Sequence, residues 1–137
     1  MMVLVDTPVW SLALRRRAVD LSAGELKITL LLQEQVRESR AQLLGPVRQE
    51  ILSGIREEAQ FRRIRNHLQG FGDVPLRMQD YEEAAALTNR CRSSGIAGSP
   101  VDMLICSVSL RNRWQIFTTD RDFSRYARVL PIQLFLH

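Results

Sequence analysis

The sequence has few cysteines, a single lysine and no long hydrophobic run. Its two cysteines, Cys91 and Cys106, form no Cys-x-x-Cys pair and have no pair of histidines nearby. This spacing argues against a disulfide framework or a zinc site, and it is typical of a protein kept in a reducing cytoplasm. No stretch approaches the ~20 apolar residues of a membrane span, and Asp6 interrupts the first apolar stretch too early for a signal peptide. We therefore expect a cytoplasmic protein with no membrane partner.

Arginine carries almost all of the positive charge. The formal net charge is +4, and Lys27 is the only lysine. A guanidinium group binds two oxygens of a phosphate or carboxylate at once, so an arginine-rich chain suits anionic partners. A GC-rich genome also encodes arginine wherever a cation is needed, so this bias alone decides nothing. The 137 residues, 45% of them hydrophobic, suffice for one domain with a core.

Strand and helix patterns alternate along the chain. Short apolar runs bounded by Gly, Pro or Asp predict strands near residues 2–6, 41–46, 73–78, 115–120 and 132–136. Helices are expected near residues 8–16, 23–39, 46–53, 57–69 and 80–93, and from residue 100 onward. Such alternation is typical of an α/β fold with a parallel sheet.

Local signals place the first helix starts. Thr7 followed by Pro8 looks like an N-cap with proline at the first helical position, where its missing N–H costs nothing. A capping box formed by Ser22 and Glu25 opens the next helix. One face of that helix is expected to hold Leu26, Leu30 and Val36.

Four acids map to one edge of the predicted sheet. Right-handed crossovers bring the carboxyl ends of parallel strands and the first turns of the following helices to the same edge, where open α/β sheets bind ligands. Asp6 and Asp120 end predicted strands, whereas Glu50 and Asp102 lie in the first turns of predicted helices. We therefore expect these four carboxylates to converge.

Each acid also has a structural explanation of its own. Asp6 could cap the strand-to-helix turn, and Ser99 with Asp102 resembles a capping box. Glu50 shares a face at helical spacing with Val47, Ile51 and Gly54, which places it at the border of a buried stripe.

The cluster as a whole needs a cation. Two carboxylates ~6 Å apart repel by roughly 3 kcal/mol at an effective dielectric constant near 20. Arginines could offset this repulsion, and so could Mg²⁺ or Mn²⁺, which prefer carboxylate oxygens. An acidic site in an otherwise basic molecule suits a polyanion that is bound by its backbone and cut at a metal.

Four stretches carry a resemblance to a known family. They are "VLVDTPVW" at 3–10, "QEILSG" at 49–54, "GIAGSPVDMLICSVSL" at 95–110 and "FTTDRDF" at 117–123. In this order and spacing they resemble a PIN domain, and most of all a VapC-type ribonuclease toxin of bacterial toxin–antitoxin pairs. The resemblance implies a single PIN domain over residues 1–137, folded as a three-layer α/β/α sandwich with a short, mostly parallel central sheet.

The same resemblance implies an activity and partners. The family consists of Mg²⁺- or Mn²⁺-dependent endoribonucleases, which are cytoplasmic, often homodimeric and held inactive by a cognate VapB-like antitoxin. Matched by motif, the acids Asp6, Glu50, Asp102 and Asp120 resemble the catalytic quartet. Among them Asp6, Asp102 and Asp120 would hold the metal, and Asp122 matches a further acid that the family often has.

Other positions match residues around the family's site. Thr118 resembles a polar residue beside the acids, and Thr7 is expected to support the site as well. Arg121 and Arg125 are candidates for gripping RNA phosphates. Cys106 stands where the family has a small alanine, a departure that we expect to affect only packing.

Three other interpretations of the sequence compete with the PIN-domain hypothesis. A response-regulator receiver needs a lysine after a late strand, and Lys27 comes too early. A haloacid-dehalogenase-like phosphatase needs Asp-x-Asp after its first strand, but position 8 is proline. A catalytically silent PIN-like module that binds RNA or protein would keep the basic surface without needing the acids, and the sequence leaves this alternative open.

The chain also predicts a reaction and a partner surface. Ribonucleases that use the 2′-hydroxyl of RNA usually need a pair of histidines, and His67 and His137 both fall outside the predicted edge. We therefore expect a water nucleophile activated by metal, leaving a 5′-phosphate and a 3′-hydroxyl. The antitoxin is expected to cover residues 8–16 and 23–39, where exposed apolar surface is predicted for Leu12, Leu14, Leu30, Leu31 and Leu32.

Overall fold

The computed structural model describes all residues, 1–137, and is built on a sheet of three parallel strands. The strands are β1 (Val3–Val5), β2 (Ala41–Gln42) and β3 (Gln115–Phe117), in the order β2-β1-β3. All three residues of the central strand β1 are buried, as expected when helices cover both faces of a parallel sheet. The α/β prediction with a parallel sheet is confirmed.

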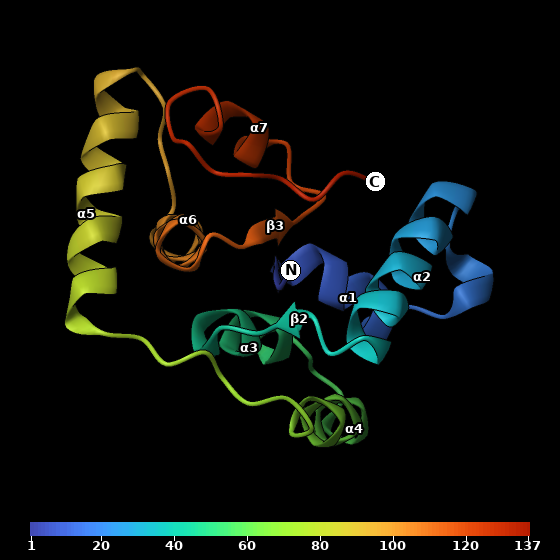
Figure 1. Ribbon diagram of the computed structural model, residues 1–137. Coiled ribbons are helices and arrows are strands. Elements are labelled where there is room, and N and C mark those ends of the chain that lie inside the picture. Colours follow the sequence, from blue (N-terminus) through green and yellow to red (C-terminus); the bar gives the residue numbers. More distant parts are fainter.

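Helices flank the sheet on both sides (Figure 1). The helices are α1 (Thr7–Arg15), α2 (Ala23–Arg37), α3 (Gly45–Leu52), α4 (Glu58–Leu68), α5 (Met78–Ser93), α6 (Pro100–Asn112) and α7 (Asp122–Tyr126), with a short 3₁₀ turn, η1 (Ala18–Asp20). Figure 1 shows α5 and α6 on one side of the strands and α1 and α2 on the other. None of these helices is both long enough and apolar enough to span a membrane.

Two of the five predicted strands are wrong. Residues 73–78 contribute only an isolated bridge, between Leu43 and Asp73, since Pro75 has no N–H to donate to a ladder. Residues 132–136 contribute only the bridge between Ile116 and Leu134, which consists of two backbone hydrogen bonds to Ile116. The sheet is therefore narrower than the sequence pattern indicates.

The first two helices differ from the prediction in detail. Asp6, not Thr7, is the N-cap of α1, since its carboxylate accepts the N–H of Thr7 at 2.8 Å. The capping box of Ser22 and Glu25 is present, but the predicted face of α2 is wrong because Leu26 and Leu30 are exposed. The buried positions of α2 are Ile28, Thr29, Leu32 and Gln35.

Core packing fixes the carboxyl ends of the strands. The indole N–H of Trp10 donates to the carbonyl of Val5 at 3.2 Å, and its ring packs edge-on against Phe71 at 5.1 Å. Just after β1, the backbone N–H of Asp6 donates to the carbonyl of Phe117, the last residue of β3, at 2.9 Å. These contacts hold the two strand ends together at the point where the predicted acids begin.

Candidate active site

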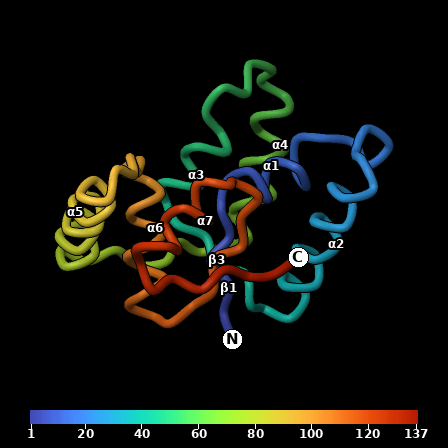
Figure 2. The backbone as a smooth tube through the Cα atoms, turned by 90° about the horizontal axis from the view of Figure 1, so that it is seen from above, coloured from blue at the N-terminus to red at the C-terminus, as the bar shows by residue number.

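The acids predicted from the sequence line one cleft beyond the carboxyl ends of the strands. In Figure 2 the chain runs from the N-terminus into β1, and α1, α3 and α7 lie beyond the far end of that strand. A cleft of about 660 Å³ opens there. Five acids from four separate segments line it: Asp6, Glu50, Asp102, Asp120 and Asp122.

Asp6 is the most deeply buried of these acids, with 3% of its surface exposed. One carboxylate oxygen accepts the N–H of Thr7, and the other accepts the hydroxyl of Thr118 at 2.7 Å. The pKa of Asp6 is raised to about 6, mainly by burial. The two hydrogen bonds oppose this rise, and the neighbouring charges of Asp102 and Asp120 add to it. Asp6 thus serves as a helix cap and also contributes negative charge to the cleft.

Glu50 lies at the border of the buried stripe of its helix, as the structural explanation of this acid predicts. Val47 and Ile51 are fully buried in α3, whereas Glu50 is exposed at the border of their stripe. Gly54 lies beyond the end of the helix with a φ of 85°. The hydroxyl of Thr7 donates to Glu50 Oε1 at 2.7 Å, so Thr7 links the first strand-to-helix corner to α3.

The tightest group of carboxylates is Asp102, Asp120 and Asp122, whose oxygen atoms come within 4.8 Å of one another. Asp6 and Glu50 line the same cleft but lie outside this group. The turn after β3 is held locally: the N–H of Asp120 donates to the Thr118 hydroxyl at 3.0 Å, and the N–H of Asp122 donates to Asp120 Oδ1 at 2.9 Å.

Asp102 is half-buried in the first turn of α6. Its N–H donates to the hydroxyl of Ser99, the N-cap, at 3.1 Å. Burial raises the pKa of Asp102, and the charges of Asp120 and Glu50 add to this effect. The helix cap therefore uses the backbone of Asp102 and leaves its carboxylate to face the other acids.

No cationic side chain lines the cleft to offset these charges. The guanidinium of Arg125 lies 3.5 Å from Asp122, but the arginine side chain is 62% exposed. Arg121 is exposed at the start of α7. A clustered set of carboxylate oxygens without nitrogen or sulfur ligands fits a hard cation such as Mg²⁺ or Mn²⁺ and does not fit zinc.

The sequence patterns missed two residues beside the acids. The hydroxyl of the buried Tyr126 donates to Asp102 Oδ2 at 2.6 Å. His137 does not line the acidic cleft, yet its Nε2 lies 2.9 Å from the carbonyl oxygen of Thr118. Helical spacing from Asp122 could have placed Tyr126 near the site, but no local signal shows that residues 131–137 fold back along β3.

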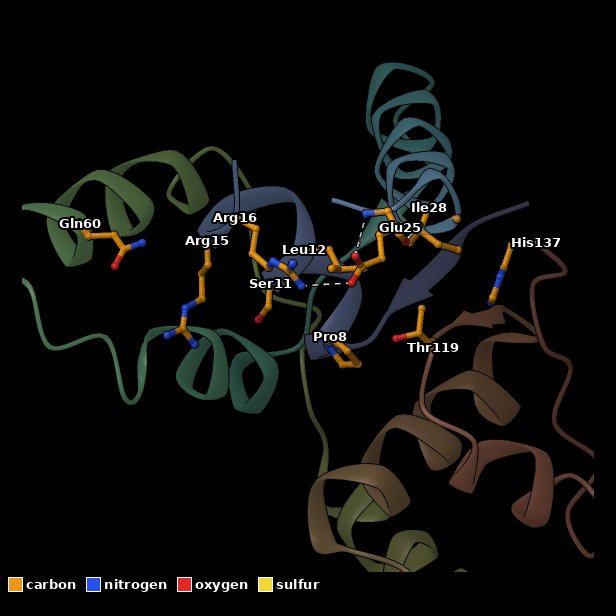
Figure 3. Close-up of a pocket in the computed structure, with 12 residues that line it drawn as sticks. Pro8, Ser11, Leu12, Arg15, Arg16, Glu25, Ile28, Gln60, Thr119 and His137 are labelled. Atoms are coloured by element: carbon orange, nitrogen blue, oxygen red, sulfur yellow. Dashed lines mark hydrogen bonds and ion pairs between the residues drawn. The ribbon is translucent and has the colours of Figure 1, made fainter. Parts of the chain in front are cut away.

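A second groove of about 810 Å³ lies between α1 and α2 (Figure 3). It is where an apolar surface is predicted, but Leu12 and Ile28 are its only hydrophobic lining residues. Of the predicted leucines, Leu32 is buried, Leu30 is 54% exposed, and the others pack partly against the core. The open surface of the groove is more apolar than polar, so an apolar groove is present where it is predicted, but Leu12 is the only one of the five predicted leucines that lines it.

Comparison with known proteins identifies the family. A model of the PIN domain matches residues 3–129. The chain belongs to the PIN domain family. Over 96% of both chains, this PIN domain is 25% identical to VapC ribonuclease Mb1587 of Mycobacterium bovis and to ribonuclease VapC11 of Mycobacterium tuberculosis.

Solved structures share the fold of this PIN domain. The structure of FitAcB from Neisseria gonorrhoeae matches with a TM-score of 0.75 at 15% identity, covering 98% of this chain and 97% of the other. VapBC2 from Rickettsia felis, bound to a DNA fragment from its promoter, matches with a TM-score of 0.71 at 12% identity and 98% coverage of both chains. These matches show that the chain shares its overall fold with both structures.

Proposed function

We propose that this PIN domain is a metal-dependent endoribonuclease of the VapC type, the toxin of a toxin–antitoxin pair. The observation that carries the proposal is the cleft itself, in which five carboxylates converge and no cationic side chain lies among them. The names of the curated relatives, which are VapC ribonucleases, support RNA as the substrate. The basic remainder of the molecule suits an RNA backbone.

The acids of the cleft would have different roles, according to where each one lies. Asp102 and Asp120, with Asp6 and Asp122 beside them, would hold a Mg²⁺ or Mn²⁺ ion, and waters would complete its ligand shell. When bound, the ion offsets the negative charge of the cleft and activates water for attack on a phosphodiester. Glu50, held by the Thr7 hydroxyl, would orient or deprotonate that water.

Residues outside the cleft would bind the RNA backbone. Arg121 and Arg125 are exposed on either side of the α7 start and would contact phosphates. Binding through phosphates releases counter-ions, so RNA affinity should fall steeply as salt rises. Replacing Arg121 with Gln should reduce the salt dependence, whereas the same change at Arg90 on the exposed face of α5 should not.

End-group analysis of cleaved RNA tests the reaction. We expect 5′-phosphate and 3′-hydroxyl ends, loss of cleavage in EDTA and recovery on addition of Mn²⁺. Calorimetry should show that Asp6→Asn and Asp102→Asn each weaken Mn²⁺ binding, with Asp20→Asn, an exposed acid outside the cleft, as the control. A 2′,3′-cyclic phosphate that survives EDTA would refute the mechanism. RNA binding without cleavage in Mn²⁺ would favour a catalytically silent binding module.

The antitoxin is proposed to occupy the groove between α1 and α2. The solved relatives include a toxin–antitoxin complex from Klebsiella pneumoniae. In Figure 3, Arg15 and Arg16 lie along one part of the groove, and Arg16 is paired with Glu25 at 3.1 Å. A segment with acidic and small apolar side chains would therefore fit this groove better than a purely apolar one.

Co-expression with the product of a neighbouring small gene for a DNA-binding protein tests this partner. Ser11→Trp, which fills the groove, should block complex formation without affecting cleavage, whereas Tyr81→Ala on α5 should leave the complex intact. Equal complex formation by both variants would place the antitoxin elsewhere. Sedimentation of the isolated protein tests the homodimer that the family resemblance implies.

A further inference from the structure

Tyr126 makes a contact with the acid cluster that the proposed roles do not use. Its hydroxyl donates to Asp102 Oδ2 at 2.6 Å, a short hydrogen bond of the kind formed between a hydroxyl and a carboxylate. Tyr126 is 1% exposed, although it carries a polar group. The cap of α6 uses the backbone N–H of Asp102, whereas the hydroxyl of Tyr126 donates to its carboxylate directly.

The phenol is held rigidly at this place. The ring of Tyr126 packs edge-on against buried Phe123 with centroids 5.1 Å apart. The carbonyl of Tyr126 accepts the N–H groups of Val129 and Leu130, which fixes the end of α7. Burial and the hydrogen bond to Asp102 raise the pKa of the Tyr126 hydroxyl, so the group remains a donor at neutral pH.

One short helix thus reaches the acid cluster from both of its ends. Asp122, the first residue of α7, contributes a carboxylate to the tight group, and Tyr126, the last residue, binds the carboxylate of Asp102 within the same group. The position of α7 therefore sets both where Asp122 lies and which way the Asp102 carboxylate turns.

We propose that Tyr126 is a positioning residue that occupies one oxygen of Asp102 and so commits this carboxylate to bind a cation through its other oxygen alone. The inference rests on the proposed metal-dependent function. Mg²⁺ and Mn²⁺ favour a small, near-octahedral shell, whereas Ca²⁺ accepts more oxygens and two-oxygen carboxylate contacts. Tyr126 therefore contributes to the preference of the site for the smaller ions.

Calorimetry with Mn²⁺ and with Ca²⁺, each alone, on wild type and Tyr126→Phe tests this selectivity. Because outer-shell partners of metal ligands contribute about 10- to 100-fold to metal affinity, the variant should bind Mn²⁺ at least about 10-fold more weakly. Its affinity for Ca²⁺ should stay the same or rise, since Asp102 is then free to offer both oxygens. Tyr81→Phe, which removes an exposed hydroxyl from α5, is the matched control and should change neither affinity.

A second measurement needs no change at Tyr126 itself. The chain has two tyrosines, so Tyr81→Phe leaves Tyr126 as the only phenol. Titration with Mg²⁺ should then shift the tyrosine absorbance, because a cation on Asp102 withdraws charge from the oxygen that Tyr126 contacts.

The outcomes separate this inference from the proposed function. An unchanged ratio of Mn²⁺ to Ca²⁺ affinity in Tyr126→Phe, or a Mg²⁺-saturated protein with unaltered tyrosine absorbance, would overturn the role of Tyr126 while leaving the nuclease proposal in place. A wild-type protein that binds neither ion would overturn both. A weakened Mn²⁺ affinity with retained Ca²⁺ affinity would support both.

Discussion

Two aspartates of this PIN domain are almost completely buried, and their pKa values move in opposite directions. Asp80, at the start of α5, is 1% exposed, and Asp6, at the cleft, is 3% exposed. Burial alone would raise the pKa of both. At Asp80 the guanidinium of Arg111 donates to the two carboxylate oxygens at 2.6 and 3.0 Å, and the N–H of Arg77 donates to one of them at 2.9 Å. These hydrogen bonds and the two arginine charges bring the net pKa below the usual value. Asp6 has only two neutral donors, and its pKa rises to about 6.

The difference distinguishes an acid that stabilises the fold from an acid whose charge is left for a bound ligand to compensate. Asp80 joins two helices, since Arg111 comes from α6 and Ser107 of α6 donates to the Asp80 carbonyl at 2.8 Å. Its charge is compensated within the protein. The charge of Asp6 is opposed by other carboxylates, so the folded protein bears a cost there that a bound cation would remove.

The largest expected effect is on catalysis. Asp120→Asn should reduce RNA cleavage by more than about 100-fold, because it removes a proposed metal ligand. Loss of a residue that only hydrogen-bonds to a metal ligand typically costs up to about 100-fold. Asp80→Asn, measured at low temperature per folded molecule, should retain cleavage because this residue lies outside the cleft. Cleavage rates in saturating Mn²⁺ for both variants check this. Equal loss in both would mean that the cleft acids act only through the fold.

The second largest expected effect is a loss of folding stability when Asp80 is replaced. Asp80→Asn leaves Arg111 without its charge partner, and we expect a loss of about 3 kcal/mol, the lower end for breaking a buried ion pair. The lower end applies because the Arg111 side chain is 28% exposed. Urea unfolding checks the value, with Glu82→Gln on the exposed face of α5 as the control. A loss no greater than that of the control would show that the pair contributes no net stability.

A change of the opposite sign is expected at the uncompensated cluster. Without metal, Asp120→Asn should raise the free energy of unfolding by about 1 kcal/mol, because it removes repulsion between close carboxylates. Two such charges repel by roughly 3 kcal/mol, and water in the open cleft screens part of this repulsion. The asparagine oxygen can still accept the N–H of Asp122. Thermal melts in EDTA check this, and a drop in stability that parallels the loss of activity would assign Asp120 a structural role.

The sequence predicted the helices and the convergence of the acids because those features have local signals. Proline and serine mark the helix starts, and a carboxylate directly after a buried strand must lie at the edge of a parallel sheet. The face of α2 had no such signal. Leu30, Leu31 and Leu32 are consecutive and point in three directions around a helix, so any of them could face the core, and the structure buries Leu32.

The distinction between the two buried aspartates could not be predicted, since it depends on partners far along the chain. Thr118 lies 112 residues from Asp6, and Arg111 lies 31 residues from Asp80. Asp80 is one acid among several in its helix, and nothing local marks it as buried. Its compensation becomes visible only when α5 packs against α6.

The smallest effect is on the pH dependence of stability without metal, where the two aspartates act in different ranges. The pKa of Asp6 is raised from 3.8 to about 6 in the folded protein, so between these values the folded state binds more protons than the unfolded state. Stability must then fall as pH rises through this range and increase as pH is lowered from 7 toward 4. Each unit of pKa shift can change the free energy of unfolding by at most about 1.4 kcal/mol. Because the titration of Asp6 is coupled to that of the neighbouring acids and the cleft is open to water, we expect the free energy of unfolding to rise by about 1 kcal/mol.

At Asp80 the sign is reversed. Its pKa is lowered in the folded protein, so its contribution is complete above the ordinary value of 3.8 and is lost as pH falls below it. The stability curve of the metal-free protein should therefore have its maximum near pH 4, where the two ranges meet. Unfolding in EDTA from pH 3 to 8 checks this shape. Asp6→Asn should flatten only the side above pH 4, and Asp80→Asn only the side below pH 4. A wild-type stability that climbs steadily from pH 5 to 7 would show that the charge of Asp6 is compensated after all.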